Sequence, residues 1–160
     1  MMGIERKSLS MTEKDRLNTA IHESGHALAC YYNKHAMKLY KATIVARGPS
    51  LGATFMVPDE GQSMNKAQVL AQIDVGMGGH VAEKLIIGNE KISSGCGSDL
   101  QGCTGLAQQA VRNWGMFGDR ISYSSTEKNN CSDAYNAEVD RVVKEILDVS
   151  VNVLLTIIYL

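Results

Sequence analysis

"TAIHESGHALACYY", residues 19–32, places two histidines four positions apart around a glutamate in an otherwise apolar helical pattern. On an α-helix, residues i and i+4 lie one above the other, so His22 and His26 face the same way and Glu23 lies beside them. Two imidazoles at this spacing suit one zinc ion, and the adjacent carboxylate suits the base that takes a proton from water. The simpler interpretation is a solvated helix face. The rarity of HExxH by chance favours the metal site.

A catalytic zinc takes a third protein ligand and keeps one position open for water. The metzincin extension would require a glycine at Ala29 and a histidine at Tyr32, and neither is present. The third ligand must therefore come from further along the chain, and the candidates are His35, Glu60, His80, Glu83, Cys96 and Asp99. Asp99 ends the glycine-rich stretch "SSGCGSD", where it suits a ligand and a helix cap equally well. Spacing alone leaves this choice open.

Composition describes a globular chain without a nucleic-acid surface. The 160 residues are 44% apolar and 21% charged, enough for one domain with a real core. The formal charge of −1 comes without a basic run, so we expect no nucleic-acid partner. The four cysteines are too scattered for a zinc ribbon and too few for a disulfide scaffold, which favours reduced thiols: Cys30, Cys96, Cys103 and Cys131.

The pattern of elements predicts a mainly α fold with one small pair of strands. "TEKD", from Thr12 to Asp15, reads as a capping box that opens a helix to about Tyr32. Two β-prone segments, residues 41–46 and 52–57, flank a Gly-Pro turn at 47–51. Ser63 is predicted to cap a helix through Ile87, with "GMGG" inside it at a close packing contact. A loop at 89–99 precedes helices over 100–117 and 132–155, and the last helix shows an apolar stripe of Val139, Val142, Ile146, Val149 and Val153.

No signal peptide or membrane anchor is encoded in "MMGIERKSLS", and the apolar end "VNVLLTIIYL" is about half the ~20 residues that a transmembrane helix needs. We expect that end to pack in the core. Because "TIIYL" stops without a polar cap, we also expect the chain to be cut from a longer protein.

Five segments resemble, in order and spacing, the peptidase domain of FtsH-like, membrane-anchored AAA proteases, and most of all the mitochondrial i-AAA branch. These segments are "HESGH", "KATIVARGPSLGATFMVP", "QIDVGMGGHVAEKLIIG", "ISSGCGSDLQGCTGLAQQAV" and "WGMF". The resemblance covers about residues 12–120 well and then weakens, with residues 120–136 matching poorly.

By this resemblance, residues 1–160 form a single helical zinc peptidase domain with a strand pair at the substrate cleft. One Zn²⁺ per chain would be held by His22, His26 and Asp99, with Glu23 as the catalytic residue. The parent protein would be a homo-hexamer that degrades unfolded or membrane proteins from an organelle inner membrane, the mitochondrial one. ATP would be used only by an ATPase module absent from these residues, which contain no GxxxxGK[ST] loop, and the membrane would be reached only through an absent N-terminal part. The fragment itself is expected to be soluble.

Some features depart from the family pattern or leave alternatives. The family has arginine at His80 and usually an acidic residue at Lys84. Glu83 is interpreted either as a partner that orients a ligand histidine or as a surface carboxylate. The alternative function is a catalytically silent assembly module of a hexameric AAA complex, but such a module would not need the base Glu23.

Substrate binding is predicted at residues 52–56. Pro58 cannot donate a ladder hydrogen bond, which suits an edge strand. An extended peptide could then add as a further strand beside the zinc, held by main-chain bonds. The strand residues concerned are Gly52, Ala53, Thr54, Phe55 and Met56.

Overall fold

The computed structural model describes residues 11–46, 50–58, 61, 63–117 and 131–159. Its main elements are α1 (Glu13–Tyr32), β1 (Lys38–Thr43), β2 (Ala53–Val57), α2 (Lys66–Ala82), α3 (Gly97–Arg112) and α4 (Asp133–Ile158). A π-helical turn (Glu83–Ile87) and two 3₁₀ turns (Asn89–Lys91 and Ser94–Cys96) connect α2 to α3. The expected mainly α fold with a small strand pair is confirmed.

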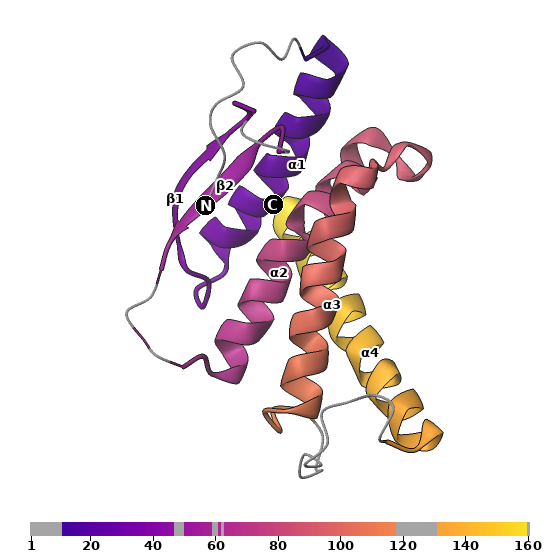
Figure 1. Cartoon of the computed structure of the whole chain (residues 1–160). Coiled ribbons are helices and arrows are strands. Elements are labelled where there is room, and N and C mark those ends of the chain that lie inside the picture. Colours follow the sequence, from indigo (N-terminus) through magenta and orange to yellow (C-terminus); the bar gives the residue numbers. More distant parts are fainter. Residues whose placement is uncertain (1–10, 47–49, 59–60, 62, 118–130, 160) are drawn as a thin grey trace.

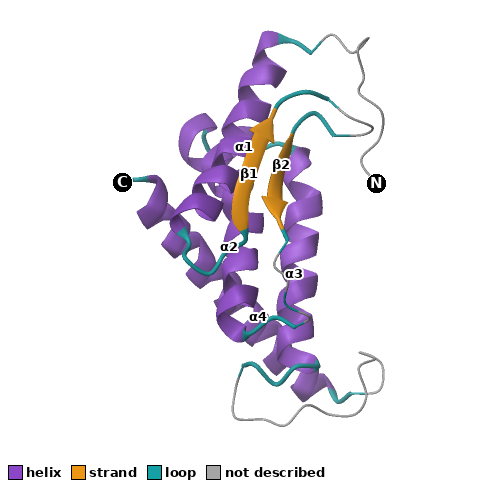
Figure 2. Cartoon of the chain, turned by 90° about the vertical axis from the view of Figure 1, so that its left-hand side faces the viewer, coloured by secondary structure: helices purple, strands orange, loops and turns teal. Residues whose placement is uncertain are grey.

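Helix α2 lies at the centre of the arrangement. Helix α1 and the strands flank it on one side, and α3 and α4 lie on the other (Figure 1). The strands β1 and β2 pair antiparallel and lie beside α1, as the rotated view shows (Figure 2). Residues from all four helices share one core, whose largest fully buried apolar side chains are Ile73, Leu154, Val69 and Val81.

Local hydrogen bonds set the helix starts. The Thr12 hydroxyl accepts from the Asp15 backbone N–H at 3.1 Å, as the sequence indicates. The predicted cap at Ser63 is wrong, because Asn65 and Gln68 form a reciprocal capping box that begins α2 two residues later. The predicted end at Gly88 is correct, where φ is +99°, but the last turn before it is π-helical.

Boundaries of β1 and α3 also differ from the predicted ones. Strand β1 begins at Lys38, three residues before the predicted start, because its partner β2 extends to Val57 and Lys38 pairs with that residue. Helix α3 begins at Gly97 instead of residue 100, which places Asp99 inside its first turn. It ends at Arg112, before the predicted end at residue 117, and Gly115 then takes a positive φ of 59°. The Gly-Pro turn lies partly outside the described residues.

Helix α4 buries a different stripe from the predicted one. Val139 and Ile146 are buried as expected, but Val149 is 58% exposed and Val153 is 38% exposed. The remaining buried positions of α4 are Val143, Ser150 and Leu154. Apolar residues surround most of this helix, so its neighbours α2 and α3 decide which stripe faces inward. The expectation that its apolar end packs in the core holds for Leu154, which is fully buried.

Helices α1 and α2 approach at two glycines. A Cβ added to Gly25 would lie 2.2 Å from the Gly78 carbonyl oxygen, and one added to Gly78 would lie 2.5 Å from the Gly25 carbonyl oxygen. Real Cβ contacts do not fall below 3.0 Å, so only glycine permits this separation. The close packing contact expected from "GMGG" is confirmed, and it brings His22 and His26 of α1 against α2.

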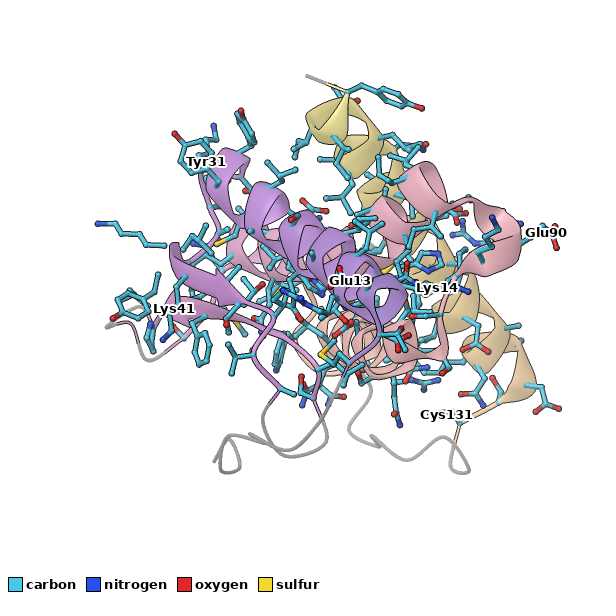
Figure 3. All side chains as sticks on the ribbon, turned by 90° about the horizontal axis from the view of Figure 1, so that it is seen from above. Glu13, Lys14, Tyr31, Lys41, Glu90 and Cys131 are labelled. Atoms are coloured by element: carbon cyan, nitrogen blue, oxygen red, sulfur yellow. The ribbon has the colours of Figure 1, made fainter. Side chains whose placement is uncertain are left out.

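The outer surface carries charged side chains and scattered apolar ones. Tyr31, which is 73% exposed, projects from the end of α1, and Lys41 projects from β1 (Figure 3). Among the described helices, none is both long enough and apolar enough to cross a lipid bilayer.

Candidate active site

Helix α1 supplies the first three residues of the site. Glu23 and His26 are each 8% exposed, and His22 is half-buried on the same side of the helix. The two imidazole rings stand edge to face with centroids 4.7 Å apart, as their i, i+4 spacing requires. The α1–α2 contact at Gly25 therefore buries the motif instead of leaving it on a solvated face.

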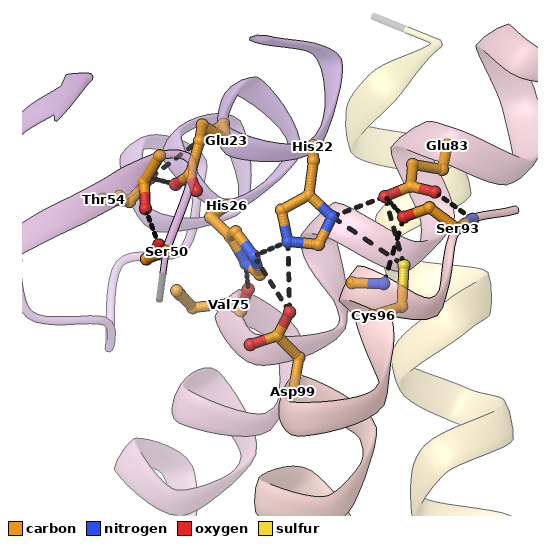
Figure 4. A network of polar contacts seen from close by, with 12 residues as sticks. His22, Glu23, His26, Ser50, Thr54, Val75, Glu83, Ser93, Cys96 and Asp99 are labelled. Carbon is orange, nitrogen blue, oxygen red and sulfur yellow. Dashed lines mark hydrogen bonds and ion pairs between the residues drawn. The ribbon is translucent and has the colours of Figure 1, made fainter. Parts of the chain in front are cut away.

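Asp99 reaches the same point from the first turn of α3. Its Oδ2 atom lies 3.1 Å from His22 Nε2 and 3.5 Å from His26 Nε2, and the two Nε2 atoms are 3.0 Å apart (Figure 4). Asp99 does not act as the N-cap of α3, because that position belongs to Cys96.

The hydrogen bonds of the two Nδ1 atoms determine which nitrogen of each ring can bind a metal ion. His26 Nδ1 lies 2.6 Å from the Val75 carbonyl oxygen, which can only accept, so this nitrogen donates. His22 Nδ1 lies 2.8 Å from Glu83 Oε1 and donates to that carboxylate. In a neutral imidazole the remaining Nε2 then carries a lone pair. Two Nε2 lone pairs and a carboxylate oxygen thus converge within 4.8 Å of one another. This donor set fits a cation such as zinc, which takes imidazole nitrogen and carboxylate oxygen.

The pKa shifts agree with a site that favours positive charge. Burial opposes the charged form of His22, but the hydrogen bonds with Asp99 and Glu83 outweigh it and raise the pKa of the imidazole. Burial likewise opposes ionisation of Asp99, yet the hydrogen bonds with His22 and His26 hold its pKa well below the usual range. Asp99 is therefore a carboxylate at neutral pH.

Glu83 is a buried carboxylate that accepts several hydrogen bonds, and it does not lie on the surface. It is 1% exposed and accepts from His22 Nδ1, from the Ser93 N–H at 2.6 Å and from the Ser93 hydroxyl at 3.0 Å. Burial would raise its pKa, but these bonds and one from Cys96 lower it overall. Glu83 therefore holds the orientation of the His22 ring while its own position is fixed by the loop before α3.

Cys96 supports Glu83 as a neutral thiol. Its Sγ atom lies 3.3 Å from Glu83 Oε1 and 3.8 Å from His22 Nδ1. Burial, followed by the nearby Glu83 carboxylate, raises the pKa of the thiol to about 12. His22, Glu83 and Cys96 also form a compact group, but the hydrogen bonds between them already engage its polar atoms.

Glu23 is held by the strand β2. The Thr54 hydroxyl donates to Glu23 Oε2 at 2.7 Å and lies 3.2 Å from the Glu23 carbonyl oxygen. Gly52 is the second contact, because a Cβ there would lie 2.8 Å from Glu23 Cγ and 2.9 Å from Oε1. The Ser50 hydroxyl in turn donates to the Gly52 carbonyl oxygen. The carboxylate is thus packed between α1 and the residues that begin β2.

These groups line an open cleft of about 550 Å³. The cleft walls include the His22, Glu23, His26 and Asp99 side chains, and also four of the five predicted substrate residues: Gly52, Ala53, Thr54 and Met56. Phe55 does not line it. The Lys41 ammonium lies 5.0 Å from the centre of the Phe55 ring.

The remaining third-ligand candidates lie elsewhere. His35 is exposed and lines a neighbouring cavity, and His80 lines a cavity between α2 and α4. Glu60 lies outside the described residues. Burial and then Lys84 lower the pKa of His80, and its Nδ1 atom is buried without a hydrogen-bond partner among the described residues.

Sequence reasoning missed three supports of the site. The Val75 carbonyl carries no sequence signal, because any residue supplies that group. Ser93 was visible only as part of a polar glycine-rich loop, and Cys96 was considered only as a possible third ligand. Their contacts with Glu83 depend on how that loop folds back over α2.

The comparisons with known proteins identify the family of the chain. The family model described as Peptidase family M41 matches residues 9–159. The chain is 44% identical over 153 residues to the ATP-dependent zinc metalloprotease YME1 homolog of Schizosaccharomyces pombe, a match covering 94% of this chain and 21% of that protein. It is 41% identical over 151 residues to the mitochondrial inner membrane i-AAA protease supercomplex subunit YME1 of Saccharomyces cerevisiae, covering 91% and 20% of the two chains.

A bacterial relative is more distant. The ATP-dependent zinc metalloprotease FtsH of Borreliella burgdorferi is 34% identical over 174 residues, covering 97% of this chain and 27% of that protein. The chain thus spans between a fifth and just over a quarter of the length of these curated relatives. With the family model matching nearly all of its residues, the chain belongs to peptidase family M41.

Proposed function

We propose that the chain is the zinc-dependent endopeptidase domain of an ATP-dependent AAA protease. The observation that carries this proposal is the convergence of the His22, His26 and Asp99 acceptor atoms within 4.8 Å beside the carboxylate Glu23. Membership of peptidase family M41 and the similarity to proteins named as zinc metalloproteases support the same conclusion.

In this proposal His22, His26 and Asp99 hold one Zn²⁺ per chain. Bound there, the ion supplies the Lewis acidity that makes a water molecule acidic near neutral pH and polarises the scissile carbonyl. Glu83 and the Val75 carbonyl accept hydrogen bonds from Nδ1 of His22 and His26, respectively. In the neutral rings these bonds leave the lone pair on Nε2, where it would be available to the ion.

Glu23 acts as the general base and then as the general acid. It accepts a proton from the attacking water and delivers it to the nitrogen of the leaving amine. The Thr54 hydroxyl and the close contact with Gly52 hold the carboxylate at the wall of the cleft. Fixing a reactive group in this way lowers the entropic part of the barrier.

Strand β2 is proposed to bind the substrate backbone. The described part of the sheet has only two strands, so β2 has one side that β1 does not cover. An extended polypeptide can pair with that side through main-chain hydrogen bonds, which favours unfolded substrates of varied sequence. A substitution at Thr54 would also disturb Glu23, so the test of this docking model is N-methylation of the substrate. Methylating a single backbone nitrogen of a peptide substrate at the docked position should raise KM.

The rest of the proposal concerns the longer protein. In this proposal residues 1–160 form a single peptidase domain, and other parts of a homo-hexameric protein supply ATP hydrolysis and attachment to an organelle inner membrane, that of mitochondria. The names of the two yeast relatives support this part, because one includes ATP dependence and the other the mitochondrial inner membrane.

The central test is the variant Glu23→Gln. Purified wild-type chain should contain about one zinc ion and cleave denatured casein in a chelator-sensitive manner. The variant should keep its zinc but lose about 10²-fold or more in turnover, the usual contribution of general acid–base catalysis. Wild-type rates in Glu23→Gln, with zinc content matched by mass spectrometry, would refute the mechanism.

A further inference from the structure

The imidazole of His22 lies against the backbone of α2 at Gly79. A Cβ added to Gly79 would lie 2.5 Å from His22 Cε1 and 2.7 Å from each of the two ring nitrogens. Because three adjacent ring atoms are almost equally near, the added carbon would sit over the face of the ring and not beside its edge. Real Cβ contacts essentially never fall below 3.0 Å, so glycine alone leaves room for the ring at this position.

The polar contacts of His22 lie at the edge of the same ring. Nδ1 donates to Glu83 Oε1 at 2.8 Å, and Nε2 lies 3.1 Å from Asp99 Oδ2 on the other side of the ring (Figure 4). These two contacts define a line through the two nitrogens, and they restrain the tilt of the ring about that line only weakly. The Gly79 backbone limits this tilt, because the face of the ring lies directly against it.

Helix α2 therefore supplies two different supports for one imidazole. Gly79 and Glu83 are four residues apart, so they face the same side of the helix, one turn from each other. Gly79 provides the surface under the ring, and Glu83 provides the acceptor for Nδ1. The neighbouring contact between Gly25 and Gly78 joins backbone to backbone and sets the distance between α1 and α2. The ring has to fit into the space that this distance leaves.

We propose, on the basis of the zinc site in the proposed function, that Gly79 is a positioning residue for the zinc-binding imidazole of His22. The missing side chain at Gly79 sets how deeply the ring lies against α2 and how it is tilted. The direction in which Nε2 presents its lone pair follows from this seat. Gly79 thus acts on metal binding through His22, and it contributes no atom to the ligand set.

The expected effect of an added methyl group follows from the contact distances. In Gly79→Ala the ring must retreat by about 0.9 Å, from 2.5 Å to the 3.4 Å at which ordinary van der Waals contact begins. A preorganised site tolerates displacements of only about 0.5 Å. The neighbour that moves is a side chain, so the two helices keep their packing. Gly79→Ala should therefore fold and bind zinc about 10–100-fold more weakly, the usual loss when the support of a metal ligand is disturbed.

Competition with a chromophoric chelator measures the zinc affinity, and Gly76→Ala is the matched control. Gly76 belongs to the same helix, and a Cβ there would lie 2.4 Å from Cys103 Sγ with no other listed contact within 4 Å. The control makes the same chemical change and also creates a side-chain contact, but it leaves His22 untouched. Its zinc affinity should equal that of the wild type. Equal losses of affinity in Gly76→Ala and Gly79→Ala would show a general packing effect and overturn the inference.

A measurement without metal tests the seat of the ring directly. In the zinc-free wild-type chain, proton NMR should show a strong nuclear Overhauser effect between the Gly79 α-protons and the Hε1 proton of His22. Absence of this signal, an unchanged zinc affinity in Gly79→Ala, or failure of that variant to fold would overturn the role of Gly79 and leave the peptidase function standing. Failure to fold counts against it because the glycine would then serve helix packing. A wild-type chain that binds no zinc would refute the proposed function together with this role.

Discussion

Replacing Gly25 by alanine should destabilise the whole fold, although alanine is the better helix former. The added Cβ would lie 2.2 Å from the Gly78 carbonyl oxygen and 2.7 Å from the Ala82 Cβ. The first neighbour is backbone in the middle of α2, so it cannot rotate away. Relief requires α1 and α2 to separate by about 0.8 Å to reach the 3.0 Å limit of real Cβ contacts.

The loss in the free energy of unfolding that this separation causes can be estimated from the packing contacts between the two helices. A radial gap of 0.5–1 Å forfeits about a quarter to a half of the dispersion energy across an interface. Overpacked core substitutions typically cost about 1–3 kcal/mol and occasionally more. Removing a glycine from a helix returns only about 0.5–1 kcal/mol. We expect a net loss of about 2–3 kcal/mol, which lowers the melting temperature by roughly 4–12 °C in a chain of this size.

Thermal and urea unfolding with matched variants provide the assay. Gly105→Ala in α3 is the control, because a Cβ there meets nothing within 4 Å, and it should stabilise the chain by about 0.5–1 kcal/mol. The double variant of Gly25 and Gly78 should cost less than the sum of the single changes, since one separation relieves both contacts. If Gly25→Ala melts at or above the wild-type temperature, the two glycines do not set the distance between the helices.

Three further outcomes are expected. Asp99→Ala should weaken zinc binding by more than about 10–100-fold, whereas Cys96→Ser should scarcely change it; equal zinc retention in both, measured by competition with a chromophoric chelator, would remove Asp99 from the ligand set. Gly52→Ala should lower turnover about tenfold or more with zinc content unchanged, because its Cβ would displace the Glu23 carboxylate, and an unaltered kcat would contradict this. Burial raises the pKa of the Asp74 carboxyl, so its contribution to stability is present below the ordinary carboxyl pKa and is lost as pH rises through the raised value. The variant Asp74→Asn should therefore melt at a higher temperature than wild type at pH 7, and the two melting temperatures should converge near pH 4. A lower melting temperature of the variant at pH 7 would refute this.

The local parts of the site could be read from the sequence. The i, i+4 geometry of a helix fixes how His22 and His26 stand relative to each other, whatever the rest of the chain does. Capping side chains likewise act within one turn, which is why the start of α1 after Thr12 was predicted correctly. The shift of the α2 cap from Ser63 to Asn65 shows the limit of this reasoning, since several polar residues nearby can serve as a cap.

The tertiary structure alone decided what surrounds the two histidines. Spacing left Asp99 balanced between a cap and a ligand, and left Glu83 balanced between a surface charge and a buried partner. The packing of α3 and the preceding loop against α1 and α2 brings both carboxylates to the imidazoles. The buried stripe of α4 was also undetermined, because its apolar residues surround most of the helix. Helix geometry is set by bonds between near neighbours in the chain, whereas these contacts join residues far apart in sequence, so only the packed core selects them.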